Sequence, residues 1–103
     1  MNFFICGCSM IIGVMTVYIS MPGVTSLKGK RSVVKSLIGR LKSRFNISIS
    51  EVDQQDNKVR AVIGISIVSN EGRFIDQQFD SIIEFMRNDG RFILGQIERE
   101  KFS

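Results

Sequence analysis

Residues 60–87 read RAVIGISIVSNEGRFIDQQFDSIIEFMR, and the apolar side chains change from two-residue to helical spacing within this stretch. Residues 60–69 alternate as a strand with one buried face does. The residues expected on that face are Ala61, Ile63, Ile65 and Ile67. Asn70 is expected to cap a helix that runs to Arg87. The residues expected on the buried face of this helix are Ile75, Phe79, Ile82, Ile83 and Met86.

The rest of the chain predicts further strands and one further helix. Pro22 and Gly23 end an apolar stretch that alternates as a strand does. Ser26 is a suitable N-cap for a helix that ends near Phe45 and carries its apolar residues on one arc. That arc consists of Leu27, Val34, Leu37, Ile38, Leu41 and Phe45. The expected boundaries are strands over 10–21, 46–53 and 91–98, a helix over 26–45, and turns over 54–57 and 88–90.

The expected order is therefore β-α-β-β-α-β, which places the chain in the α+β class. Right-handed crossovers then give a ferredoxin-like sandwich, in which a four-stranded antiparallel sheet has both helices on one face. A chain of 103 residues suits one domain. We expect this domain to cover residues 10–103, with residues 1–9 as an N-terminal extension.

The sheet face without helices, here called the open face, is expected to be apolar enough to bind a partner. Its expected residues are Ile12, Val14, Thr16, Tyr18, Val62 and Val68. A homodimer with a twofold axis would bury Val14, Tyr18 and Val62. Recognition of single-stranded RNA on this face is not expected, because the strand over 60–69 has no aromatic residue to stack on a base.

The helix over 26–45 carries seven cations and no acid. They are Lys28, Lys30, Arg31, Lys35, Arg40, Lys42 and Arg44. Acids are absent from residues 1–50, whereas residues 51–103 hold all ten of them. Lysine and arginine supply most of the sequence-independent affinity for nucleic acid, so this helix predicts contact with phosphates.

The cations lie on both sides of the apolar arc at helical spacing. Lys28, Arg31, Lys35 and Lys42 gather on one flank, and the remaining three lie on or beside the other. An alternative to RNA binding is neutralisation within the fold. The second helix carries Asp76, Asp80 and Glu84 in one stripe that could pair with one flank of the first helix.

Three stretches resemble the YlxP-like proteins, which are small bacterial proteins of uncharacterised function. They are MIIGVMTVYISMPGVTSLKGKRSVVKSL from residue 10, RFNISISEVDQQD from residue 44, and RAVIGISIVSNE from residue 60. The resemblance implies a ferredoxin-like fold and a cytosolic protein whose genes often neighbour those for translation initiation and ribosome maturation. It implies no catalytic residues. Gly29 and Tyr18 stand where the family commonly has an acid, which makes this basic helix more positive than is usual there.

Composition disfavours several kinds of chemistry. Histidine, the commonest general base near neutral pH, is absent, and two cysteines, Cys6 and Cys8, are too few for a structural zinc site. Glu51, Asp53 and Asp56 suggest a metal site, but no third ligand beside the first two is evident. An acylphosphatase would use Arg31 and Asn70, yet the loop over 22–31 is no glycine-rich anion cradle. We therefore expect neither an enzyme, nor a metal, nor a cofactor.

The uncharged stretch over 2–27 is long enough to span a bilayer, but its alternation from Met10 onward is typical of a strand. We therefore expect a cytoplasmic protein with no membrane attachment. The predicted function is binding of ribosomal or precursor RNA, or of a ribosomal subunit, through the basic helix. The alternative is a dimeric protein-interaction module that uses the open face.

Overall fold

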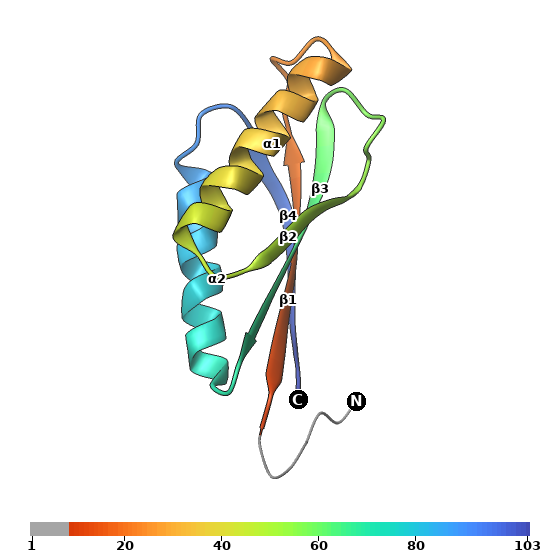
Figure 1. Ribbon diagram of the computed structural model, residues 1–103. Coiled ribbons are helices and arrows are strands. Elements are labelled where there is room, and N and C mark those ends of the chain that lie inside the picture. Colours follow the sequence, from red (N-terminus) through yellow and green to blue (C-terminus); the bar gives the residue numbers. More distant parts are fainter. Residues whose placement is uncertain (1–8) are drawn as a thin grey trace.

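A computed structural model describes residues 9–103 of the chain and has the predicted order of elements (Figure 1). The predictions for residues 1–8, including Cys6 and Cys8, lie outside the described residues. The elements are β1 (Ile11–Ser20), α1 (Leu27–Arg44), β2 (Ser48–Asp53), β3 (Arg60–Ser69), α2 (Gly72–Arg87) and β4 (Ile93–Phe102).

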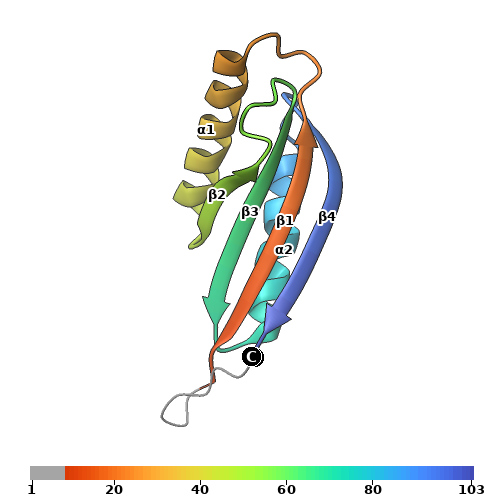
Figure 2. The ribbon, with the colours of Figure 1, turned by 90° about the vertical axis from the view of Figure 1, so that its right-hand side faces the viewer.

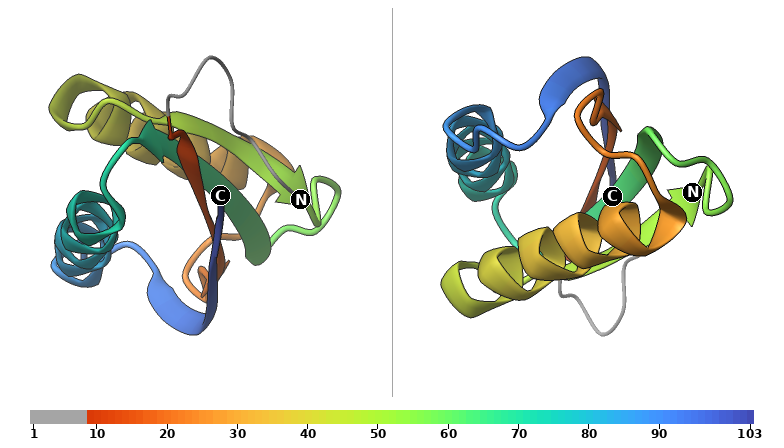
Figure 3. Two further views of the ribbon diagram at one scale, coloured as in Figure 1. Left: turned by 90° about the horizontal axis from the view of Figure 1, so that it is seen from below. Right: turned by 90° about the horizontal axis from the view of Figure 1, so that it is seen from above.

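The four strands form one antiparallel sheet in the order β2-β3-β1-β4. Figure 2 views the sheet from its open face, with α2 behind the strands and α1 to the left, beside β2. α1 packs against β2, and α2 packs against the other three strands, so the helices share one face of the sheet (Figure 3). The predicted ferredoxin-like α+β fold is therefore confirmed.

The core lies between the sheet and the helices, where the alternation of the strands predicted it. β1 directs Met15, Val17 and Ile19 inward, and each of them is at most 3% exposed. The residues predicted from β3 and α2 are also in the core, with Ile83 only partly buried. Gly13 permits close packing of α2, because a Cβ atom there would lie 2.3 Å from Ile75 Cγ2. Residue spacing thus decides which face of each element is buried.

The N-terminal ends of the two helices differ in how they are capped. The Ser26 side chain accepts a hydrogen bond from the Gly29 amide at 3.0 Å, as predicted for α1. The prediction that Asn70 caps α2 is wrong. Glu71 occupies the cap position without a side-chain cap bond, and its amide donates to the Ser69 hydroxyl at 3.1 Å. The serine at the end of β3 thus accepts a hydrogen bond from the backbone amide just before α2.

β4 begins and ends later than predicted, running to Phe102 instead of residue 98. Its charged C-terminal part continues to pair with β1, as far as Phe102 opposite Ile12. The register opposite Met15 and Gly13 places Arg99 and Lys101 on the helix side, where they bind acids on α2. No helix within residues 9–103 is long and apolar enough to cross a membrane.

Candidate nucleic-acid interface

Four of the seven predicted cations form one exposed row on α1, here called the basic flank. Its members are Lys28, Arg31, Lys35 and Lys42. Spacings of three, four and seven residues place them on the same side of a helix with 3.6 residues per turn. Within residues 9–103, no carboxylate lies within 4.0 Å of any of them. From its first to its last member, the row spans about 21 Å at ~1.5 Å per residue.

Lys30 is not available for phosphate contact, which corrects its place in the predicted RNA-binding set. It is 0% exposed, and its Nζ lies 2.6 Å from Oε2 of Glu51 on β2. Nζ also donates a hydrogen bond to the Gln54 carbonyl oxygen. The Glu51 oxygen is buried and has no other donor in the described part of the chain. Lys30 and Glu51 therefore form a buried ion pair that joins α1 to β2.

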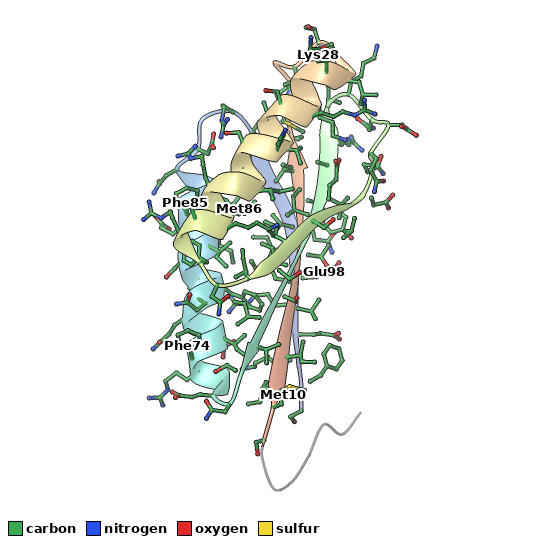
Figure 4. All side chains as sticks on the ribbon, viewed as in Figure 1. Met10, Lys28, Phe74, Phe85, Met86 and Glu98 are labelled. Carbon is green, nitrogen blue, oxygen red and sulfur yellow. The ribbon has the colours of Figure 1, made fainter. Side chains whose placement is uncertain are left out.

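Arg40 and Arg44 lie on the other flank of α1, which faces α2. Both guanidinium groups lie over the Phe85 ring, at 5.1 and 4.8 Å from its centre. Arg40 also pairs with Asp89 at 3.3 Å. Figure 4 shows Phe85 beside the C-terminal end of α1 and Lys28 at the opposite end of that helix. These two arginines, here called the paired flank, are already engaged within the fold.

Asp89 connects the ends of several elements. Its side chain is only 4% exposed and accepts hydrogen bonds from the guanidinium and backbone amide of Arg91. The Arg91 hydrogen bond is the main reason that the pKa of Asp89 is lowered, and it also raises the pKa of Arg91. Arg91 further donates to the Ser36 hydroxyl on α1 at 3.1 Å. This cluster anchors the paired flank to the start of β4.

The acidic stripe of α2 forms no ion pair with α1 within residues 9–103. The alternative that this stripe neutralises one flank of α1 is therefore wrong. Asp76 lies 2.6 Å from Lys101, and Asp80 lies 2.7 Å from Arg99, with both cations on β4. The hydrogen bond from Lys101 is the main cause of the lowered pKa of Asp76. Within residues 9–103, the one ion pair of Glu84 is with Arg87 of its own helix, at 4.0 Å. α2 packs over β1 and β4, so its acids meet the cations of β4 first.

The open face contains the predicted dimer residues, but they differ in exposure. Tyr18 is 37% exposed, whereas Val62 is only 6% exposed and offers little surface to a partner. Val14 is half-buried. The Tyr18 hydroxyl donates to Glu98 on β4 at 3.2 Å, and this hydrogen bond is the main cause of its raised pKa. The homodimer remains a prediction, with Val62 as a minor contributor.

The carboxylates that suggested a metal site are not brought together, although Glu51 and Asp53 would share a face in a regular strand. A bulge in β2 pairs Glu51 with Ile63 but Asp53 with Val62, so the two carboxylates do not share a face. Glu51 instead binds Lys30 in the interior. Within residues 9–103, no group of three or more metal-ligating side chains is present.

Sequence reasoning missed two contacts that sort the cations of α1. Lys30 lies four residues before Val34 and seven before Leu37. This spacing places Lys30 within the apolar arc of the helix. Glu51 follows Ile49 by two residues and therefore falls on the inward face of β2. Two opposite charges at core positions are a signal for a buried pair. Nothing in the local sequence pointed to the contact between Phe85 and the paired flank.

Comparisons with known proteins agree on fold and family. The chain has a TM-score of 0.53 to the de novo designed protein Foldit4, at 11% identity over 92% of this chain and 98% of that one. The de novo designed protein Ferredog-Diesel gives a TM-score of 0.48 at 13% identity, over 97% of this chain and 91% of that one. The uncharacterised protein YlxP of Bacillus subtilis (strain 168) is 36% identical over 61 residues, which are 59% of this chain and 66% of that protein. The family model described as protein of unknown function (DUF503) matches residues 12–99. Because this match covers most of the chain, and because the YlxP relative agrees with it, the protein belongs to the DUF503 family.

Proposed function

We propose that the protein binds structured RNA without catalysing a reaction, and that the basic flank of α1 contacts the phosphates. The observation that carries this proposal is the uneven pairing of charges. Lys30, Arg40, Arg91, Arg99 and Lys101 each bind a carboxylate within the fold. The four residues of the basic flank bind none within residues 9–103 and stand exposed in one row. Cations held in a row but left without acids suit a partner that supplies the negative charge.

A rigid helix flank suits phosphates on structured RNA better than unstacked bases. Bases of single strands bind by stacking on aromatic side chains, and β3 has none on the open face. The basic flank likewise contains only lysine and arginine, which contact backbone oxygens without reading sequence. The resemblance to proteins whose genes neighbour translation genes favours ribosomal or precursor RNA as the class of ligand.

The test measures affinity for a ribosomal RNA hairpin by fluorescence anisotropy over a range of salt concentrations. Four phosphate contacts predict that log K falls against log salt with a slope of about −3 to −4. The double variant Lys35→Gln, Lys42→Gln should flatten the slope by about 2 units. The matched control is Arg40→Gln, Arg44→Gln, which removes the same charge from the paired flank. Its slope should remain close to that of the unmodified protein.

Two results would contradict the proposal. An affinity that does not depend on salt would mean that phosphates are not the ligand. An equal loss in both double variants would mean that the protein's net charge, and not the basic flank, attracts the RNA. Circular dichroism of each variant, recorded well below its melting temperature, confirms that the compared proteins are folded.

A further inference from the structure

Among the strands of residues 9–103, β4 forms one edge of the sheet and has β1 as its one neighbour, so its outer backbone groups face no other described strand (Figure 2). A bulge interrupts its pairing with β1 between Leu94 and Ile97, and from Ile97 to Phe102 the register is continuous. On the opposite edge, β2, a bulge limits the continuous register with β3 to Ser48–Glu51. Short or bulged edges resist pairing, whereas a longer regular edge can accept an added strand from another protein. β4 is therefore the better edge for such an addition.

The open-face side of this edge carries two carboxylates without cationic partners. Glu98 and Glu100 line a hollow together with Val14 and Thr16 of β1 and with Arg99, whose guanidinium pairs with Asp76 and Asp80 on α2. Within residues 9–103, no lysine or arginine nitrogen lies within 4.0 Å of either glutamate. In the described part of the chain, the side-chain donors to Glu98 are both neutral, the Tyr18 hydroxyl and the Gln96 amide. The hollow therefore places two carboxylates without a cationic partner beside Val14 and Thr16.

A second copy of this chain fits the edge poorly. Antiparallel pairing of two β4 strands that is centred on any residue from 98 to 100, with the open faces aligned, brings Glu98 or Glu100 opposite another glutamate. Like charges directly opposite each other destabilise paired strands. Packing the open faces of two copies together would supply few cations to Glu98 and Glu100. Arg60 is the one cation on that face of the described strands. The charges that disfavour self-pairing favour a cationic strand instead.

The residues on the helix side of the same edge restrict the partner further. Arg99 and Lys101 point to that side and already bind Asp76 and Asp80. An added strand would therefore need cations toward the open face and uncharged residues at the positions between them. We propose that β4 binds an extended segment of a partner protein that carries lysine or arginine at alternate positions. This surface is separate from the basic flank and does not depend on RNA binding.

The test uses a short fluorescent peptide in which lysine alternates with threonine or valine, and a matched peptide with glutamate in place of lysine. The lysine peptide should bind, and the glutamate peptide should not. The double variant Glu98→Gln, Glu100→Gln should bind the lysine peptide at least about fivefold more weakly, because two cross-strand charge pairs are lost. The control Asp56→Asn, Glu71→Gln makes the same change in net charge at exposed positions elsewhere and should bind as the unmodified protein does.

Amide hydrogen exchange measured with and without the lysine peptide gives a second readout, since strand addition should slow exchange along β4. Absent binding, equal weakening in both double variants, or protection confined to α1 would overturn the proposal. Sedimentation supplies a further check. A stable dimer of the unmodified protein that Val14→Lys dissociates would assign the open face to a second copy and likewise overturn the proposal.

Discussion

The two flanks of α1 carry the same kinds of side chain but differ in what those side chains contact. On the paired flank, Arg40 and Arg44 lie over Phe85, and Arg40 also binds Asp89. On the basic flank, Lys35 and Lys42 stand exposed without a carboxylate partner within residues 9–103. The paired flank is thus engaged in joining α1 to α2, whereas the basic flank remains available to a ligand. A charge count over the helix would not distinguish these two roles.

Lys30 separates the flanks and belongs to neither of them. It lies at the centre of the buried stripe, beside Val34 and Leu37, and its charge is matched by Glu51. Burying a charge is costly unless it is paired, so the two residues depend on each other. The cations of α1 therefore include a third kind besides those of the two flanks, a buried cation that is paired inside the fold.

The largest expected effect comes from removing that buried cation. Lys30→Met should lower the free energy of unfolding by about 3 kcal/mol, because Glu51 would keep a largely buried charge without a partner. Urea denaturation measures the loss. If it is smaller than about 1 kcal/mol, Lys30 does not stabilise the fold as its burial implies.

A second substitution separates pairing from packing at this position. Lys30→Met combined with Glu51→Leu removes both charges, and it should recover most of the stability lost in Lys30→Met. The double variant should also bind RNA as the unmodified protein does, since the basic flank is unchanged. Weaker RNA binding by a stably folded double variant would mean that Lys30 supports the ligand surface as well as the core.

An intermediate effect is expected at Asp89, which anchors the paired flank. Asp89→Asn should lower the free energy of unfolding by about 1–2 kcal/mol, because charge-assisted hydrogen bonds from Arg91 and Arg40 are weakened. The pKa of Asp89 is lowered in the folded protein, so its contribution is complete above the usual pKa of an aspartate. It is lost as the pH falls through the lowered value. Denaturation over a pH series measures the free energy of unfolding of the unmodified protein and of Asp89→Asn. The difference between these two free energies should be constant near neutral pH and shrink below about pH 4.

The sequence predicted the fold well because periodicity records which faces are buried. Alternation in β3 and the stripe of α2 predicted Ile63, Ile65 and Phe79 in the core, and Ser26 predicted the start of α1. The start of α2 was wrong by one position, because Glu71 and not Asn70 occupies the cap. The Ser69 hydroxyl, at the end of β3, accepts a hydrogen bond from the Glu71 amide just before the helix begins. Local signals of this kind compete over one or two residues.

The candidate site was only partly predictable, since charge pairing depends on which elements become neighbours. Spacing separated Lys28 and Lys35 from Arg40 correctly, because it depends only on the helical repeat. The partners of Asp76 and Asp80 were assigned wrongly. Which cations those acids meet depends on α2 lying over β4, and no local pattern specifies that placement.

The smallest expected effects test the comparison of the two flanks directly. Arg40→Gln, Arg44→Gln removes two cation–π contacts and should lower the free energy of unfolding by about 1 kcal/mol. Lys35→Gln, Lys42→Gln removes the same charge from exposed positions and should change it by less than about 0.5 kcal/mol. Thermal denaturation of both variants, set beside their RNA affinities, should show opposite patterns: lost stability with retained binding for the arginines, and retained stability with lost binding for the lysines. If one double variant loses both properties and the other loses neither, stability and ligand binding are not divided between the two flanks.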